Sequence, residues 1–318
     1  FWMWLEFRRV LFRSIRGGSS LNASNDPLIV IDGLAMDNQG VKGLSNPLSM
    51  VNPADIESFT VLKDASATAI YGSRGSNGVI IITTKKGRKG SRAKVSYNGS
   101  VTISQKHKTQ EVMTGDQFVD FVKSYYGEDS DAYKALGVTE NNEQKFYNTD
   151  WQKEIYQTAL SFDNNVTVTG SIKNVPFRAS LGATNQEGIL RTSDFDRYTA
   201  SLNVNPSLLE DHLKVNLSAK YMYAKTTYAD GGAVGAAVGM DPTKPVRSSD
   251  ARYKNFGGYF QWLQNGSVLG DSQWPETKID LATANPVSML DLKNDVAKSH
   301  AFVGNMEFDY QVHGFEDL

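Results

Sequence analysis

The stretch Gly72-Ser73-Arg74-Gly75-Ser76-Asn77-Gly78 has the residue types that most suggest a chemical site. Glycine-rich loops bind phosphate through backbone N–H groups, usually with a Lys-Ser or Lys-Thr pair at the start of a following helix. No such pair follows here, and residues 79–84 are β-branched throughout, which predicts a strand instead of a helix. We therefore interpret the loop as a tight turn in which glycine supplies a positive φ.

Residues that could support catalysis or bind a metal are scattered along the chain. The histidines His107, His212, His300 and His313 form no i, i+4 pair and have no carboxylate at metal-ligand spacing. The chain has no cysteine, which excludes thiolate metal sites and disulfides, and it has no Gly-x-Ser-x-Gly elbow. The sequence thus predicts no catalytic residue, no metal, no cofactor and no enzyme.

Aromatic residues gather in the glycine- and proline-containing segment 228–298. Tyr253, Tyr259, Trp262 and Trp274 are candidates for stacking on sugar rings of a substrate. The same residues could instead pack against other loops, and the sequence leaves both interpretations open. A structureless loop of this length would be unusual in a compact soluble domain.

Composition limits the class of protein. The 318 residues include 33 Lys and Arg against 35 Asp and Glu, a balance that argues against nucleic acid as a partner. No run approaches the roughly 18 apolar residues of a membrane-spanning helix. A transmembrane β-barrel remains compatible with the sequence, because its lipid face occupies only alternate residues.

The elements around the glycine loop predict a small α+β domain. We expect strands over 28–31, 57–62 and 79–84, with a turn at Asp32-Gly33 after the first strand. Asp64 is placed to cap a short helical turn over 65–71. The third strand should be buried on both faces, because it is β-branched throughout.

The same residues carry a family resemblance. The runs 61–75 (VLKDASATAIYGSRG), 77–80 (NGVI) and 83–87 (TTKKG), with 15–17 (IRG) and 27–33 (PLIVIDG) upstream, closely resemble the plug domain of SusC/RagA-type TonB-dependent outer-membrane transporters. In such a plug the matching positions have structural or gating roles, and here they are Asp32, Gly33, Lys63, Asp64, Tyr71, Gly72, Arg74, Gly75, Asn77 and Gly78.

The resemblance implies an α+β plug domain followed by the N-terminal part of an antiparallel transmembrane β-barrel, which would be incomplete. It implies TonB-dependent import of an oligosaccharide or peptide nutrient across the outer membrane of a Gram-negative, Bacteroidetes-like cell, with the plug gating the lumen. Implied partners are a SusD-like surface lipoprotein, the TonB-ExbB-ExbD complex and outer-membrane lipid. The alternative is a surface β-rich module that binds carbohydrate without transporting it.

Alternation of apolar and polar residues predicts the remaining strands. It covers 93–103, 162–172, 177–184, 197–204, 213–223 and 302–312. The period alone does not decide whether the apolar sides face a core or lipid. Tyr221, Tyr223 and Tyr310 are expected near strand ends, where an aromatic girdle would lie. Helices are expected over 116–126, capped by Thr114 and ended by Gly127, and over 151–158.

We expect a plug over 15–87, a linker over 88–92 and barrel strands over 93–318, with an extracellular loop at about 228–298. Residues 1–14 are expected to be non-native, because Leu11-Phe12-Arg13-Ser14 matches one reading frame of a common sequencing-adapter end; the alternative is a genuine but divergent amphipathic stretch. A secretion signal and the TonB box are expected upstream of the chain. The last strand stops short of barrel closure, so residues 1–318 alone are not expected to insert as a stable barrel.

Overall fold

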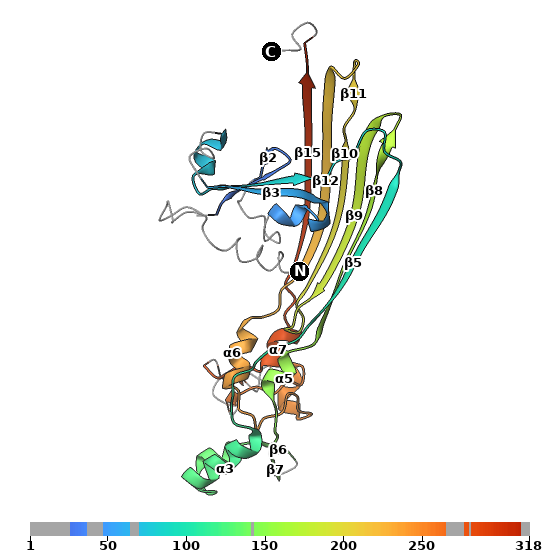
Figure 1. Ribbon diagram of the computed structural model, residues 1–318. Coiled ribbons are helices and arrows are strands. Elements are labelled where there is room, and N and C mark those ends of the chain that lie inside the picture. The colour runs from blue at the N-terminus through green and yellow to red at the C-terminus, as the bar shows by residue number, and fades with distance from the viewer. Residues whose placement is uncertain are drawn as a thin grey trace.

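The computed structural model describes residues 26–36, 47–63, 70–140, 143–264, 277–279 and 281–312, which form two main β-sheets and several short helices (Figure 1). The small sheet lies beside one face of the large sheet, and most of the helices gather at one end of the large sheet (Figure 1). None of the helices in these ranges is long and apolar enough to cross a membrane.

The small sheet is the core of an N-terminal unit, residues 26–84. Its strands are β1 (Leu28–Ile31), β2 (Leu34–Ala35), β3 (Ile56–Leu62) and β4 (Val79–Thr84), in the order β2-β1-β4-β3. β1 and β4 are parallel and the other pairs are antiparallel. Ile29 and Ile80 pack on one face of the sheet and Leu28 and Val79 on the other. The prediction that the strand over 79–84, which is β4, is buried on both faces is therefore confirmed.

Short 3-10 turns connect these strands, namely η1 (Pro47–Met50), η2 (Pro53–Asp55) and η3 (Gly72–Gly75). Gly72 and Gly78 adopt φ values of 62° and 94°, as a tight turn requires. The Gly78 N–H donates to the Gly75 carbonyl at 3.0 Å, and the Gly78 carbonyl accepts from the Leu28 N–H. The loop is therefore a turn that fastens β4 to β1. Asp64 and most of the expected 65–71 turn lie outside the described residues.

The large sheet has seven antiparallel strands. They are β5 (Lys94–Ser104), β8 (Ala159–Ile172), β9 (Val175–Glu187), β10 (Asp194–Val204), β11 (Ser207–Leu208), β12 (Leu213–Thr227) and β15 (Val296–Tyr310). Their order is β11-β12-β10-β9-β8-β5, and β15 pairs with β12. All six predicted strands are present, and several are longer than the alternation indicated. Tyr221 and Tyr223 consequently lie inside β12, which corrects their expected position near a strand end; Tyr310 does end β15.

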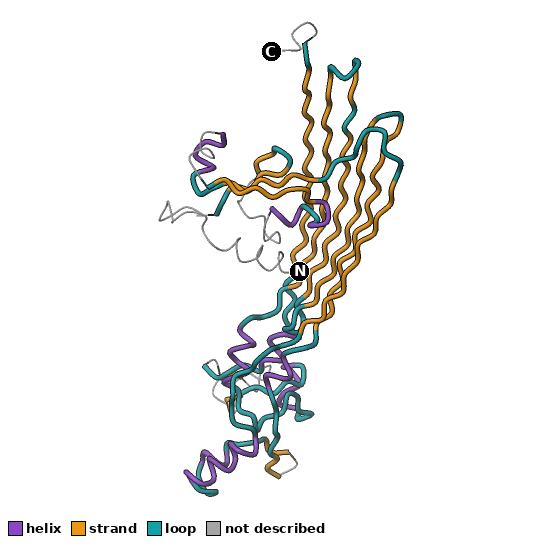
Figure 2. Tube along the Cα trace, in the orientation of Figure 1, coloured by secondary structure: helices purple, strands orange, loops and turns teal. Residues whose placement is uncertain are grey.

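The connections differ sharply between the two ends of the large sheet (Figure 2). At one end β8 turns into β9 through Lys173 and Asn174, whose φ values of 47° and 68° suit a two-residue hairpin. At the other end lie the connections 105–158, 188–193 and 228–295. These three connections form what we call the loop module.

The loop module contains short elements packed around a common core. Its helices are α3 (Gly115–Tyr126), α4 (Asp131–Lys134), α5 (Trp151–Ile155), α6 (Gly232–Gly239), η4 (Ala251–Phe256) and α7 (Pro286–Asp291), and its strands are β6 (Val138–Glu140), β7 (Glu143–Lys145), β13 (Leu263–Gln264) and β14 (Thr277–Lys278). Val138 and Trp151 from the first connection pack with Ala233, Phe260 and Leu290 from the third. The described part of 228–298 is thus folded, not an unstructured loop.

Helix α3 follows the predicted capping closely. Thr114 forms a capping box with Gln117, and Gly127 ends the helix with a φ of 83°. Val122 is buried, whereas Phe121 and Tyr125 are 45% and 72% exposed, so these two aromatic residues of the helix do not pack into a core. The second predicted helix is shorter than expected, because Tyr156 is already extended.

Candidate functional site

The face of the large sheet toward the N-terminal unit, here called the inward face, is mostly polar, although Met222 and Ala224 on it pack with Met50 of the unit. Antiparallel alternation places one set of side chains on this face and the other on the opposite, outward face. Nearly all fully buried side chains with polar groups in the large sheet point inward: Asn165, Thr167, Arg178, Ser180, Thr184, Asn203, Lys220 and Ser299. Buried polar groups need partners, and the N-terminal unit supplies several of them.

Asp32 joins the N-terminal unit to β12. Its carboxylate accepts hydrogen bonds from the Thr84 backbone N–H and the Thr84 hydroxyl, both at 2.7 Å, and from the Lys220 ammonium. Asn305 donates to the Asp32 carbonyl oxygen at 3.0 Å. Burial alone would raise the pKa of Asp32, but the hydrogen bonds from Lys220 and Thr84 outweigh burial and hold this pKa below its usual value. Asp32 is therefore ionised against Lys220 at neutral pH.

Asp55 makes a second connection, to β9. Its carboxylate accepts from the Arg178 guanidinium at 2.6 Å and from the Ser180 hydroxyl at 2.5 Å. The Ser180 hydroxyl also lies 2.7 Å from the hydroxyl of Ser201 on β10. Nearby, Gly182 leaves room for the N-terminal unit, because a Cβ there would lie 2.7 Å from the Asn52 amide nitrogen. Two buried carboxylates of the unit thus meet two buried cations of the sheet.

Ion pairs of this kind fix one docked arrangement. An intact buried pair adds little net stability, because desolvation offsets the attraction, whereas losing one partner costs several kcal/mol. The N-terminal unit can leave the inward face only if both carboxylates and both cations become hydrated or find new partners. The contact can therefore act as a latch, which holds until a force or a competing ligand separates the charges.

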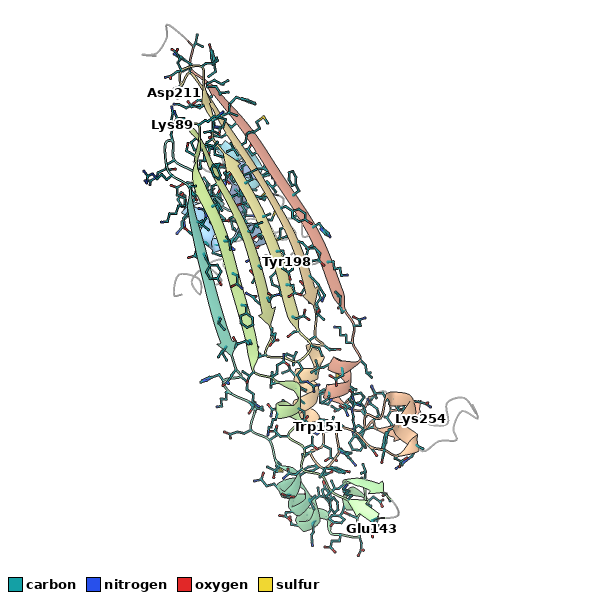
Figure 3. All side chains as sticks on the ribbon, turned by 90° about the vertical axis from the view of Figure 1, so that its right-hand side faces the viewer. Lys89, Glu143, Trp151, Tyr198, Asp211 and Lys254 are labelled. Carbon is teal, nitrogen blue, oxygen red and sulfur yellow. The ribbon has the colours of Figure 1, made fainter. Side chains whose placement is uncertain are left out.

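The outward face is apolar and exposed. We call its apolar stretch the apolar band; within it every outward residue is apolar, aromatic or glycine except Asn164, whose side-chain oxygen accepts from the Tyr97 hydroxyl at 2.6 Å. Figure 3 views this face, with Tyr198 labelled on it. The band occupies alternate positions of 95–103 on β5, 162–168 on β8, 177–183 on β9, 198–204 on β10, 215–221 on β12 and 302–310 on β15.

The apolar band crosses the strands obliquely. At the end nearer the loop module, the last band residue on β5 is Ile103, which pairs with Leu160 of β8. The last band residue on β15 is Phe302, which is aligned with Val166 of β8 through the register of the strands between them. This shift of six residues is about 20 Å along the strands, across five strand spacings of about 24 Å in total. The strands therefore tilt by about 40° from the normal of the band, within the roughly 35–45° of transmembrane barrels.

A groove of about 960 Å³ opens in the loop module. Backbone and side chains of 109–114, 148–152 and 237–242 line it, together with Phe118, Trp262 and 281–283. Gln152 is held there by its hydrogen bonds with the backbone of Gln110, at 2.9 and 2.7 Å. Hydroxyl, amide and carboxylate groups beside an indole ring suit a polar ligand that also offers an apolar face.

The structure separates the four aromatic candidates. Tyr253 and Tyr259 are buried in the core of the loop module, at 5% and 2% exposed, so the interpretation of these two as substrate-contacting is corrected to packing. Tyr259 also donates to the Asp291 carboxylate at 2.7 Å. Trp262 lines the groove and stays a candidate, whereas Trp274 lies outside the described residues.

The remaining candidates of the N-terminal unit have local roles or no assigned one. Arg74 donates to the Met36 carbonyl at 2.9 Å instead of pairing with an inward carboxylate of the sheet. Tyr71 packs against the core, and Lys63 is exposed directly after β3. Asp32 reaches the large sheet through its side chain, which accepts from the Lys220 ammonium.

Sequence reasoning missed Asp55, Arg178 and Lys220. The sequence pattern could have identified Arg178 and Lys220, because each is a cation on the polar side of an alternating strand whose apolar side faces outward. Asp55 carried none, because an acidic residue in a short turn is ordinarily exposed. Their pairing depends on contacts between residues 123 and 188 positions apart.

Lys244 crosslinks the loop module. Its ammonium donates to the carbonyls of Ala135 and Gly137, both at 2.5 Å, and lies 4.7 Å from the Trp262 ring centre. Burial lowers the pKa of Lys244 to about 8, although Asp241 at 3.9 Å opposes this shift. The folded module thus binds the Lys244 proton less tightly than the unfolded chain does.

We expect the stability of the loop module to rise between pH 8 and 10.5 because of Lys244. In that range the unfolded chain holds the proton and the folded module does not, so folding gains up to about 3 kcal/mol. The measurement is urea unfolding followed by tryptophan fluorescence, for the complete protein and its Lys244→Met variant. The difference in free energy of unfolding between the complete protein and its Lys244→Met variant should change with pH over this window. A constant difference would contradict the lowered pKa of Lys244.

Comparisons with known proteins agree with this geometry. A family model described as TonB-dependent Receptor Plug Domain matches residues 9–79. The TonB-dependent receptor SusC of Bacteroides thetaiotaomicron is 53% identical over 305 residues, which cover 96% of this chain and 29% of that receptor. The TonB-dependent receptor P26 of Formosa agariphila is 31% identical over 297 residues, covering 93% of this chain and 27% of the relative.

A solved structure resembles the chain as well. The RagAB peptide importer in its closed-closed state superposes with a TM-score of 0.66 at 25% identity, covering 94% of this chain and 34% of that one. The chain therefore spans about a third of the length of the proteins it matches. Its large sheet corresponds to part of the barrel in that structure, which confirms the predicted fold class.

Proposed function

Because this chain belongs to the SusC/RagA-type TonB-dependent receptors, we propose that it supplies the plug and barrel strands of a receptor that imports an oligosaccharide or a peptide across the outer membrane. The N-terminal unit belongs to a plug for which we propose the bounds 15–87, and 88–92 link it to the barrel strands that begin at residue 93. The loop module, which contains most of the extracellular loop expected at about 228–298, lies on the extracellular side.

The apolar band carries this proposal. A water-soluble protein rarely exposes a contiguous apolar surface larger than a few hundred Å². Here Leu181, Phe302 and Met306 are 66%, 71% and 59% exposed, while the cations Arg178 and Lys220 are buried on the other face. This arrangement suits lipid outside and a plugged, polar lumen inside. It also argues against the alternative of a soluble surface module that binds carbohydrate without transport.

The latch gives the plug a route to gating. Asp32 with Lys220 and Asp55 with Arg178 hold the plug on two strands of the barrel wall. We propose that the TonB-ExbB-ExbD complex, pulling on a TonB box elsewhere in the receptor, separates these pairs and opens the lumen. A SusD-like surface lipoprotein would cover the loop module as a lid.

The groove of the loop module supports a substrate role on the extracellular side. Trp262 lines the groove, and the Gln152 amide is already oriented by its two hydrogen bonds with the Gln110 backbone. An oligosaccharide and a peptide both combine hydrogen-bonding groups with apolar faces, so the groove suits either class. Its volume of about 960 Å³ accommodates several sugar or amino-acid residues.

Deletion of the complete gene tests the proposal. We expect the deletion strain to lose uptake of the oligosaccharide or peptide whose use is encoded beside the gene, and a plasmid copy to restore uptake. A Trp262→Ala copy should restore it only partly. Unchanged uptake and growth in the deletion strain would refute the transport role, and recovery of the protein in a soluble fraction would refute the membrane location.

A further inference from the structure

The polar edge of the apolar band lies toward the loop module. Just beyond the band on the outward face come Asn185 on β9, Asp196 on β10, Tyr223 on β12 and His300 on β15. Rings gather here, since Tyr223 lies 4.8 Å from His300 between ring centres, and the Tyr221 hydroxyl lies 2.8 Å from His300 Nδ1. Tyrosine at such an edge is typical of a membrane–water interface.

Two lysines lie directly beyond this ring of side chains. Lys225 of β12 and Lys298 of β15 are register partners, and both belong to the outward set of their strands. Their Cβ atoms are therefore about 5 Å apart. Each is four residues past the last residue of the band on its strand, or about 10 Å along the membrane normal at the 40° tilt. A head-group layer extends about 5–8 Å beyond the hydrocarbon core on each side, so lysines at this height would reach it by extending their side chains back toward the band.

Lys225 and Lys298 face each other as like charges, and on the same outward face Asp196 of β10 lies in register with Lys225, with Asp194 two residues further along β10. No ion pair is found for either ammonium among the described residues, and like charges directly opposite on a sheet repel. Asp196 is the register partner of Lys225 on the other side, but its carboxylate accepts from the Asn185 amide at 2.8 Å. An external anion that both ammonium groups could reach would relieve the repulsion.

We propose that Lys225 and Lys298 bind the phosphate of a phosphorylated glycolipid in the outer leaflet, with the acyl chains of the lipid lying on the apolar band. The inference rests on the proposed membrane location. Charge and depth both favour a lipid phosphate, because the band that continues below the lysines offers acyl chains a surface, through Tyr221 and Phe302, which free phosphate would leave unused. The site would anchor the barrel wall between β12 and β15.

The test uses the complete receptor, extracted from its membrane in mild detergent, with bound lipid counted by native mass spectrometry. Phosphorylated lipid A and its dephosphorylated form are then added back as probes. We expect Lys225→Gln/Lys298→Gln to bind phosphorylated lipid A roughly 30-fold more weakly, because each lysine near an anionic lipid surface contributes about fivefold in affinity. The dephosphorylated probe should bind both proteins equally, and inorganic phosphate should not compete at equal concentration.

A matched control neutralises two exposed lysines of the loop module, Lys153→Gln/Lys254→Gln, and should bind the lipid as the parent does. Asp196→Asn should bind more tightly, since it removes a competing carboxylate beside Lys225. If the Lys225/Lys298 variant is correctly assembled in the outer membrane and still retains as much lipid as the parent, the proposed site is overturned. Absence of the parent receptor from that membrane would instead overturn the proposed function.

Discussion

Replacement of Lys220 by methionine is expected to loosen the plug from the barrel wall by about 3–5 kcal/mol, the usual cost of removing one partner of a buried ion pair. The side chains of Lys220 and Asp32 are 4% and 11% exposed, so water cannot readily replace the lost ammonium. The Asp32 carboxylate would keep only its hydrogen bonds from Thr84. Cleavage of the plug by protease in the assembled receptor should therefore accelerate by at least about 100-fold, because cleavage tracks the open population.

Two variants make this result specific. Lys214→Met changes an exposed lysine on the same strand and the same face, and it should leave the cleavage rate unchanged. Asp32→Asn/Lys220→Met removes both charges, and it should protect the plug better than Lys220→Met alone does. Wild-type protection in the Lys220→Met receptor would show that the pair does not hold the plug.

The latch should also respond to acid in a defined direction. Since the pKa of Asp32 lies below its ordinary value of 3.8 in the folded protein, its contribution is complete above pH 3.8. The contribution is lost as the pH falls further, through the lowered pKa of the folded state. Above pH 3.8, titration of Asp32 should no longer change the strength of the latch contact.

Leu181→Arg is expected to cost about 2–4 kcal/mol of barrel stability and to reduce assembly into the membrane, because it would place a charge against lipid in the middle of the apolar band. Leu181 is 66% exposed in the chain itself. In a water-soluble protein the same change at an exposed leucine would usually stay within about 0.5 kcal/mol. The measurement is urea-induced unfolding in lipid vesicles, together with the amount of heat-modifiable receptor in the outer membrane.

Leu292→Arg is the matched control, because Leu292 is 64% exposed but lies in the loop module. That variant should assemble and unfold as the parent does. If Leu181→Arg and Leu292→Arg behaved alike, the outward face would not be in contact with lipid.

The alternation of residue types predicted the strands of the large sheet well. Leu181 and Phe302 stand on the apolar sides of their strands in the sequence, and both lie on the apolar band. Alternation could not say whether those sides meet lipid or a protein core, since both environments select the same residues. The decision needed the register of six strands, which aligns the apolar stretches into one tilted band.

The candidate site was predicted less completely. Asp32 was identified as a plug residue from its motif, but its partner Lys220 is 188 positions away, and no local pattern predicts such a contact. Tyr253 and Tyr259 were candidates either for contact with substrate or for packing against other loops, and they form part of the core of the loop module. Aromatic residues in a long connection have the same local pattern whether they bind a ligand or pack together, and only the contacts between connections distinguish the two.

The most direct test of the central claim compares the two faces of the large sheet. The chain contains no cysteine, so single thiols can be introduced at outward Leu181 and Phe302 and at inward Ser201 and Ser299, and spin-labelled in the receptor in lipid nanodiscs. The outward labels should collide with oxygen dissolved in lipid and be protected from a water-soluble nickel complex, whereas the inward labels should be shielded from oxygen in lipid by the plug and the sheet. Outward labels that are freely accessible to the nickel complex would contradict a lipid-facing band.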